Sequence, residues 1–174
     1  MTEIVARQLQ LPCGKLLIAS YGDELCLCDW LNNPRHERNV RRLENTLGSR
    51  LIVGNSHVLS QLEKQLGEYF MGSRCRFDIP MLLVGTPFQQ TVWQYLAQIP
   101  FGQTVSYAQE AEVLGCPAAV RAVAQANAAN PLSIVLPCHR VVGSNGQLGG
   151  YAGGVGAKQY LLQHEKALCL DSLI

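Results

Sequence analysis

The sequence has little charge and almost no charge imbalance. Of its 174 residues 16% are charged, and 14 Lys and Arg against 13 Asp and Glu leave a formal net charge of +1. Disordered chains combine low hydrophobicity with high net charge, so the 48% hydrophobic content excludes disorder. Length and composition instead predict a buried core in one domain or two small ones. The charge balance gives no indication of a polyanionic partner.

A long uninterrupted apolar run is also missing. The longest uncharged stretch covers residues 79–109, but prolines, glycines and glutamines interrupt it and make it unsuited to lipid. The first residues, MTEIVARQLQ, include charged side chains and no apolar signal core. We therefore expect a cytoplasmic protein that does not enter the membrane.

No CxxC pair occurs, although the chain has 7 cysteines. Cys13, Cys26 and Cys28 with His36 or His57 could be considered as zinc ligands, but their spacing matches no typical zinc pattern. In a cytosolic chain most cysteines are reduced and buried. Cys26 and Cys28 alternate on a predicted strand and are expected to share one face as core residues. We predict neither a metal nor a cofactor.

The first half of the chain, residues 1–84, is predicted to form a small α/β unit. Short apolar runs bounded by glycines predict strands at residues 16–20 and 25–30, and helical spacing predicts helices at 35–47 and 57–71. The helix at 35–47 contains several arginines. A solvated helix face is the default interpretation of these charges, and a nucleic-acid-binding patch is the alternative.

The second half, residues 85–174, is predicted to be mostly helical. A capping signal at residues 86–89 begins a helix that is expected to end at residues 100–102. A short helix at 106–114, a Gly-containing turn and a helix at 118–129 follow. This is the outline of a helix-turn-helix DNA reader. The outline is weak by itself, since many helical hairpins never contact DNA.

The helix at residues 118–129 is rich in alanine and holds one cation, Arg121. An alanine-rich helix is often simply close-packed. The alternative is a helix whose small side chains let its backbone approach a large surface, with Arg121 as a single functional projection.

The stretch at residues 130–142 carries the chemistry. A turn at its start and a proline before Cys138 fix the approach to that cysteine. A thiol becomes a nucleophile only as thiolate, and a nearby imidazole can accept its proton. A helical turn at residues 137–139 would bring Cys138 and His139 within reach of a bridging water.

A third group should orient the imidazole of His139, and Glu165 is the best candidate. Glu165 shares one face of the last predicted helix with several leucines, so the carboxylate should be partly buried and need a partner. The alternative is a surface pair of Glu165 with Lys158 or Lys166.

Residues 137–141, Pro-Cys-His-Arg-Val, resemble the active-site signature of the O6-alkylguanine-DNA alkyltransferases, also called methylated-DNA–protein-cysteine methyltransferases. The resemblance covers nearly all of residues 85–168, and its motif is highly specific. The further matching positions are residues 85–88, 93, 100–102, 107, 121–123, 130–131, 149–154 and 161–165. The N-terminal half matches the family only in length and coarse pattern.

The resemblance implies an α+β fold in two domains. Residues 1–84 would form a ribonuclease-H-like α/β scaffold, and residues 85–174 a mostly helical domain with a winged-helix-like helix-turn-helix. The implied activity is irreversible, stoichiometric transfer of the alkyl group from O6-alkylguanine, and also from O4-alkylthymine, to the protein's own cysteine. The implied partner is double-stranded DNA that contains O6-alkylguanine. The protein would act as a monomer without a cofactor.

The resemblance also implies a role for each residue of the reacting site. Cys138 would accept the alkyl group, His139 would deprotonate it through a water, and Glu165 would orient His139. Asn130 would brace the turn that holds the cysteine. Tyr107 would donate a proton or a hydrogen bond to the guanine as it leaves.

The same resemblance places the DNA contacts on the helix at residues 118–129. Arg121 would enter the base stack where the target nucleotide has flipped out. The other implied DNA contacts are Ala122, Ala124, Gln125 and Ala128. The implied lining of the base pocket is Val141, Tyr151 and Ala152.

Two functions of other classes remain open. The first is a non-catalytic DNA-binding or lesion-flagging module that uses the same helix-turn-helix, against which the presence of Cys138 argues. The second is a cysteine hydrolase built on Cys138, His139 and Glu165.

The charge balance predicts how DNA would be held. Between residues 86 and 150 the charges are Arg121 and Arg140 against Glu110 and Glu112, so this segment is neutral. Backbone amides and helix ends would then do much of the positioning of phosphates. We expect DNA affinity to fall only shallowly with salt, compared with a DNA reader that uses many cations. The slope of log affinity against log salt concentration checks this, and a steep slope would point to the arginines of the helix at 35–47.

Overall fold

The computed structural model describes residues 2–171 and is a mixed α/β structure. Its strands are β1 (Ile4–Leu11), β2 (Gly14–Tyr21), β3 (Glu24–Trp30), β4 (Leu51–Val53), β5 (Val105–Ser106) and β6 (Val141–Val142). Its helices are α1 (His36–Leu47), α2 (His57–Met71), α3 (Pro87–Leu96), α4 (Tyr107–Val113), α5 (Val120–Ala128) and α6 (Val155–Asp171), with a short 3₁₀ helix, η1, at Cys138–Arg140. The strands and helices predicted for the first half are confirmed as β2, β3, α1 and α2.

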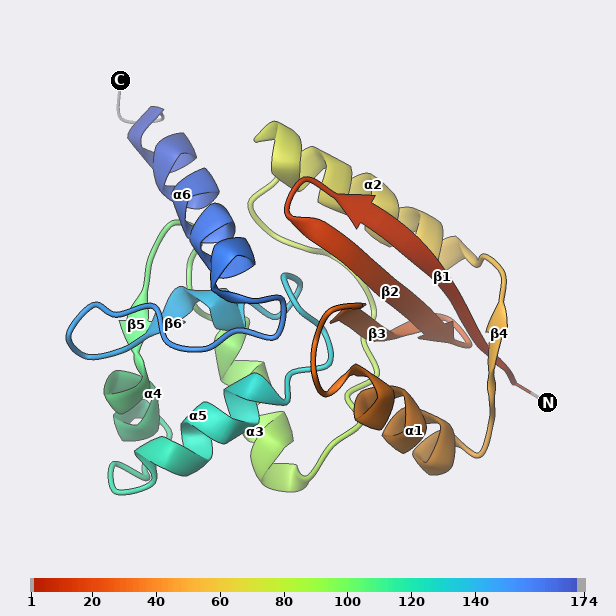
Figure 1. The fold of residues 1–174 in the computed structure, drawn as a ribbon, viewed down its shortest axis with the longest axis horizontal. Coiled ribbons are helices and arrows are strands. Elements are labelled where there is room, and N and C mark those ends of the chain that lie inside the picture. The colour runs from red at the N-terminus through yellow and green to blue at the C-terminus, as the bar shows by residue number, and fades with distance from the viewer. Residues whose placement is uncertain (1, 172–174) are drawn as a thin grey trace.

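A four-stranded sheet organises the first half of the chain. Its order is β3-β2-β1-β4, with β2 antiparallel to both neighbours and β1 parallel to β4. The helices α1 and α2 cover opposite faces of the sheet (Figure 1), because alternate residues of each strand point to opposite sides. Leu62 and Leu66 of α2 belong to the larger hydrophobic cluster, and Leu43 of α1 belongs to the smaller one.

Two strands of this sheet are absent from the sequence-based prediction. In β1, the polar residues Arg7, Gln8 and Gln10 interrupt the apolar alternation on which strand prediction depends. β4 has 3 residues, too few to show a period. Both strands form because they pair with neighbours that are distant in the sequence.

A β-bulge in β3 changes the expected positions of two cysteines. The consecutive β2 residues Ala19 and Ser20 pair with β3 residues that are two positions apart, so Cys26 is an extra residue. The expectation that Cys26 and Cys28 share one face is therefore wrong. Cys28 lies in the larger cluster with α2, and Cys26 lies in the smaller cluster with α1. Both are fully buried.

Capping interactions begin α3 and α4 at the predicted positions. The hydroxyl of Thr86 accepts a hydrogen bond from the backbone of Gln89, whose side chain accepts one from the backbone of Thr86 in return. Ser106 and Gln109 repeat this arrangement at the start of α4. The helices α4 and α5 lie within their predicted ranges, contact each other and are joined by residues 114–119.

The first helix of the second half ends earlier than predicted. α3 ends at Leu96, before the expected end at residues 100–102. The backbone N–H groups of Gln98 and Ile99 donate to carbonyls three positions earlier, so the chain leaves the α-helix through tight turns.

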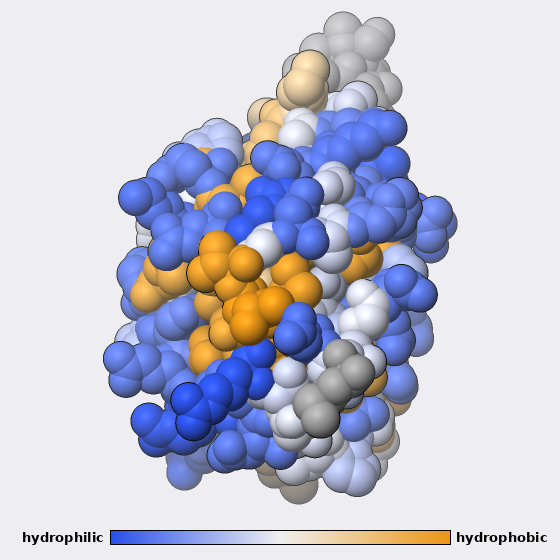
Figure 2. Space-filling model, turned by 90° about the vertical axis from the view of Figure 1, so that its right-hand side faces the viewer, coloured by the Kyte–Doolittle hydropathy of each residue, from blue (hydrophilic) through white to orange (hydrophobic). Residues whose placement is uncertain are grey.

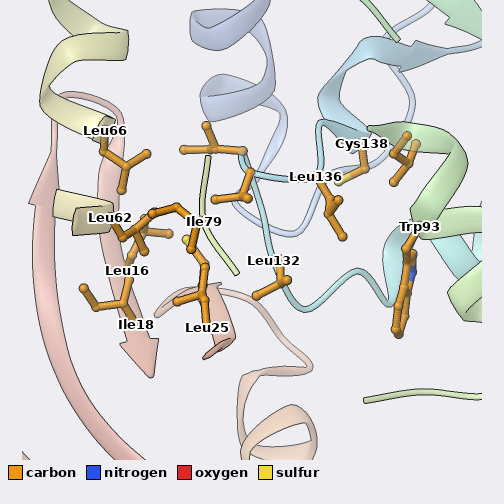
Figure 3. Close-up of a cluster of buried hydrophobic side chains, with 14 of the residues drawn as sticks. Leu16, Ile18, Leu25, Leu62, Leu66, Ile79, Trp93, Leu132, Leu136 and Cys138 are labelled. Carbon is orange, nitrogen blue, oxygen red and sulfur yellow. The ribbon is translucent and has the colours of Figure 1, made fainter. Parts of the chain in front are cut away.

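The two halves of the chain share the larger hydrophobic cluster. β3 lies at the edge of the sheet, where Leu25 exchanges backbone hydrogen bonds with Pro80 and Leu82, and Cys28 exchanges them with residues 131 and 133. Figure 3 shows side chains of this cluster from α2 on one side to Trp93 and Cys138 on the other. The segment that precedes the cysteine is therefore anchored to the sheet. The domain boundary between residues 84 and 85 stays a prediction.

The outer edge of the sheet exposes apolar side chains. β4 lies at the right of Figure 1, on the side that faces the viewer in Figure 2, where apolar residues gather among polar ones. Ile52 and Val53 of this strand are 41% and 94% exposed. Within residues 2–171, no helix has the length and apolar character needed to cross a membrane.

Candidate active site

The segment that leads to Cys138 is buried and braced by Asn130. The side-chain N–H of Asn130 donates to the carbonyl of Leu136 (2.8 Å), and its side-chain oxygen accepts from the backbone N–H of Leu132 (2.9 Å). Ile134 has a φ of 71°, a left-handed conformation that a β-branched residue rarely adopts. Such a conformation persists only where the surrounding contacts hold it. Asn130 thus lies behind the turn that carries Cys138, as expected.

Glu165 is the centre of a buried hydrogen-bond network. Its carboxylate accepts hydrogen bonds from ring Nε2 of His139 (2.7 Å), the guanidinium of Arg140 (2.8 and 3.1 Å), the hydroxyl of Tyr69 (2.6 Å) and the backbone N–H of Gly102 (3.1 Å). His139 is 0% exposed and Glu165 is 1% exposed. The predicted contact between the imidazole and this carboxylate is confirmed.

This network determines which nitrogen of His139 carries the proton. Burial by itself would raise the pKa of Glu165, but the hydrogen bonds and charges of His139 and Arg140 lower it well below its ordinary range. An ionised carboxylate can only accept, so Nε2 of His139 is the protonated nitrogen. Burial lowers the pKa of His139, which keeps the ring neutral. Among the described residues Nδ1 has no hydrogen-bond partner, so it can act as a base.

Burial keeps the thiol of Cys138 in its neutral form. Burial raises its pKa from the ordinary value of 9.0 to about 11, while Asn130 and the positive charge of Lys158 oppose this increase. A reaction at this sulfur would therefore require the thiol to lose its proton, because only the thiolate is strongly nucleophilic.

Lys158 is a buried cation at the start of α6. Its ammonium group donates to the carbonyl oxygens of Val141 (2.8 Å), Gly150 (3.4 Å) and Leu148. Burial lowers its pKa to about 8. These contacts hold residues 141–150 over the site. The alternative of a surface pair of Glu165 with Lys158 or Lys166 is wrong. Glu165 is buried and pairs with His139 and Arg140, and Lys158 donates to backbone carbonyls.

A cleft of about 430 Å³ opens over Cys138. Its lining comes from five parts of the chain: Asn33, Pro34 and Arg35; Tyr107; Arg121, Ala124, Gln125, Asn127 and Ala128; Cys138; and Gly149, Gly150, Tyr151 and Ala152. The cleft thus brings together most of the predicted DNA-contacting and pocket residues.

Two of the predicted residues lie elsewhere. Ala122 lines a neighbouring depression between α1 and α5. Val141 is fully buried, and its carbonyl oxygen is occupied by Lys158. The functional roles assigned to the individual residues stay predictions.

Two tyrosines form part of the cleft wall. The rings of Tyr151 and Trp30 of β3 pack edge to face, with ring centroids 5.9 Å apart. Burial, and then the charge of Cys138, raise the pKa of Tyr107, so its hydroxyl keeps its proton and can act as a donor. A Cβ atom at Gly153 would lie 2.6 Å from the ring of Trp30, so glycine is needed for this close approach.

The contribution of the N-terminal half to the cleft was missed by the sequence analysis. Residues 33–35 are held there by Asp29, whose buried carboxylate contacts Asn33 (2.9 Å), His36 (2.8 Å) and Asn39 (3.2 Å). A charged residue inside the apolar run of β3 was the available signal, because a buried carboxylate needs partners. Its partners could not be identified from the pattern alone. Among the described residues no cluster of His, Cys, Asp and Glu is suited to hold a metal ion.

Comparisons with known proteins agree with this geometry. The family model for the 6-O-methylguanine DNA methyltransferase, DNA binding domain, matches residues 87–167. A methylated-DNA–protein-cysteine methyltransferase of Mycobacterium leprae is 39% identical over 98% of this chain and 97% of its own length. The constitutive enzyme of that name from Bacillus subtilis is 41% identical over 89% of this chain and 91% of its own.

The likeness extends to a solved structure. The crystal structure of Mycobacterium tuberculosis OGT in complex with DNA matches with a TM-score of 0.81 and 37% identity, and the match covers 94% of each chain. The chain belongs to the methylated-DNA–protein-cysteine methyltransferase family. The similarity to these relatives extends over the N-terminal sheet as well as the helical half. The motifs recognised in the sequence lie only within residues 85–168.

Replacing Glu165 with Gln is expected to lower the free energy of unfolding by about 3–5 kcal/mol, because the buried guanidinium of Arg140 loses its counter-charge. Chemical denaturation measures this change. Glu63→Gln is a matched control, since Glu63 pairs with Arg7 at the surface and its loss should cost less than about 1 kcal/mol. Similar costs for both variants would contradict the central place of Glu165 in the network.

Proposed function

We propose that this protein repairs DNA by transferring the alkyl group from O6 of guanine to its own Cys138. The observation that carries the proposal is a cleft over a buried thiol, next to a histidine whose free nitrogen is set by Glu165. O4-alkylthymine offers the same chemistry, an alkyl group on an exocyclic oxygen. The thioether that forms is stable, so each molecule acts once.

The proposed reaction uses the groups that the network positions. The thiol proton of Cys138 passes through a water to Nδ1 of His139, which remains bound to Glu165. The sulfur attacks the alkyl carbon, the bond from that carbon to O6 breaks, and guanine keeps the electron pair. Tyr107 donates a proton or a hydrogen bond to the guanine as negative charge develops on the departing base. The positive charge of Lys158 favours the thiolate.

DNA must be deformed before this reaction is possible. The alkyl group of O6-alkylguanine lies inside the duplex, so the nucleotide has to be extruded into the cleft. α5 presents exposed alanines that permit close approach to a groove, with Arg121 exposed at the cleft. The inserted side chain of Arg121 would compensate for the lost stacking.

Arg35 adds a second exposed guanidinium at the same cleft, from the N-terminal half. We infer that it contacts a phosphate beside the flipped nucleotide, because phosphate contacts position a protein on DNA. Together with Arg121 it still supplies few cations, so the shallow salt dependence remains the expectation.

The finer description of the fold belongs to the same proposal. Residues 1–84 would be ribonuclease-H-like, which the sheet with helices on both faces supports. Residues 85–174 would be winged-helix-like, with α4 and α5 as the helix-turn-helix. The protein would act as a monomer in the cytoplasm on double-stranded DNA, without a cofactor.

An oligonucleotide with O6-methylguanine should add the mass of one methylene group to the peptide that contains Cys138. Cys138→Ser should abolish this transfer and leave DNA binding largely intact, because a hydroxyl is a weaker nucleophile than a thiol. Peptide mass spectrometry and duplex binding check the two effects. Cys116→Ser, outside the cleft, is the control and should transfer normally.

Other outcomes would indicate other functions. Transfer retained by Cys138→Ser would mean that another cysteine is the acceptor. Tight duplex binding with an unmodified peptide would indicate a lesion-binding module. Repeated turnover of an ester or amide would indicate a cysteine hydrolase.

Arg121→Ala should slow transfer from duplex DNA by about tenfold or more, and should affect free O6-benzylguanine much less, because only the duplex requires base flipping. Single-turnover rates on the two substrates measure the difference. Arg41→Ala is the control, since Arg41 is exposed on α1 and lines a depression away from the cleft. An equal decrease in the transfer rate on both substrates would show that Arg121 does not act in base flipping.

A further inference from the structure

Glu110 is a fully buried carboxyl group that the proposed reaction does not use. It is 0% exposed and lies in α4, which packs against α5. Its Oε2 accepts a hydrogen bond from the side-chain amide of Asn127 in α5 (2.7 Å). Among residues 2–171 it forms no ion pair, so a charged carboxylate here would be uncompensated.

Two atoms of this buried pair have no hydrogen-bond partner in the described part of the chain. They are Oε1 of Glu110 and Oδ1 of Asn127. An ionised carboxylate and an amide oxygen both only accept hydrogen bonds, so an ionised Glu110 satisfies neither atom. A protonated carboxyl supplies the missing donor: an O–H on Oε1 would donate to the amide oxygen, while Oε2 accepts from the amide N–H.

We infer that Glu110 is protonated in the active protein, where its acid–amide pair with Asn127 holds α4 against α5 beneath the cleft, and that its ionisation slows alkyl transfer. This regulation of the site rests on the proposed function. Asn127 connects the pair to the site, since it is buried (4% exposed) and also lines the cleft over Cys138. Ionisation would remove the O–H donor of the pair and leave only the hydrogen bond from Asn127 to Glu110 between α4 and α5, the helix that carries Arg121.

The surroundings of Glu110 determine the pH of this transition. Burial raises its pKa from 4.5 to about 7, and the hydrogen bond from Asn127 opposes this increase. Two titratable side chains interact with its charge, Tyr107 on the same helix and Tyr95 on α3. Burial is the main cause that raises the pKa of each tyrosine, and a negative charge on Glu110 adds to the increase. β5 and β6, which also contact α4, add only valine and serine.

The charge of Glu110 also acts on the reacting sulfur. A negative charge on Glu110 raises the pKa of Cys138, whereas the positive charge of Lys158 lowers it. An ionised Glu110 therefore disfavours the thiolate and also the charge that develops on the departing guanine. Both effects slow alkyl transfer, and the loss of the acid–amide pair slows it as well.

Glu110→Gln tests the inference, because a glutamine amide mimics the protonated acid at every pH. It can donate an N–H to Oδ1 of Asn127 and accept through its oxygen. Transfer rates to Cys138 should match those of the wild type at pH 6. At pH 8.5 the variant should be faster by roughly tenfold, on both methylated duplex and free O6-benzylguanine.

The decisive quantity is the ratio of variant to wild-type rate, because the thiolate fraction rises with pH in both proteins. Glu112→Gln removes an exposed charge of the same helix and should leave the ratio near one at every pH. Glu110→Ala should lose the pairing with Asn127 and be slower than Glu110→Gln at pH 6. A constant ratio for Glu110→Gln from pH 6 to pH 8.5 would overturn the inference.

A second measurement needs neither DNA nor transfer. A carboxyl with a raised folded-state pKa stabilises the fold at low pH, and this contribution is lost as pH rises to the folded-state value. The stability of the wild type relative to Glu110→Gln should therefore fall between pH 4.5 and about 7. A pH-independent difference would show that Glu110 is not protonated. Absence of transfer at every pH would overturn the proposed function instead, and the stability measurement would still report on Glu110.

Discussion

The buried carboxylate of Glu165 is the interaction on which the rest of the site depends. A charge in the interior is costly unless hydrogen bonds and an opposite charge surround it. The donors reach Glu165 from α2, from η1 and from the turn after α3, so all of these elements must meet at α6. The hydroxyl of Tyr69 makes the N-terminal half part of the site. The same contacts orient His139 and leave its second nitrogen free.

Burial also keeps the thiol of Cys138 protonated, because it raises the pKa of that group to about 11. The raised pKa of Cys138 suits a protein that is consumed by one reaction, because a permanent thiolate would be open to oxidation and to other electrophiles. The positive charge of Lys158 acts on this sulfur, and in the proposed reaction His139 takes its proton. Lys158 also anchors the loop that leads to Tyr151 through its hydrogen bonds to backbone carbonyls. The same cation therefore affects both the charge at Cys138 and the shape of the pocket.

Local patterns predicted the regular elements well and the irregular ones poorly. A capping signal located the start of α3, because such a signal acts within a few residues, and α4 lies within its predicted range. The bulge at Cys26 was missed because it depends on how β3 pairs with β2. The strands β1 and β4 were missed because their stability comes from pairing partners rather than from an apolar period.

The sequence by itself determined the reactive group and its nearest neighbours: Cys138, His139 and Asn130 lie within a short stretch whose motif is specific to one family. It also indicated Glu165, since an acidic residue on an apolar helix face needs a buried partner. Only the tertiary structure decided what surrounds them. Tyr69 lies 96 positions from Glu165, and Asn127 lies 17 positions from Glu110 on another helix. No local pattern encodes such pairs, because hydrogen bonds between side chains far apart in sequence exist only after the chain has folded.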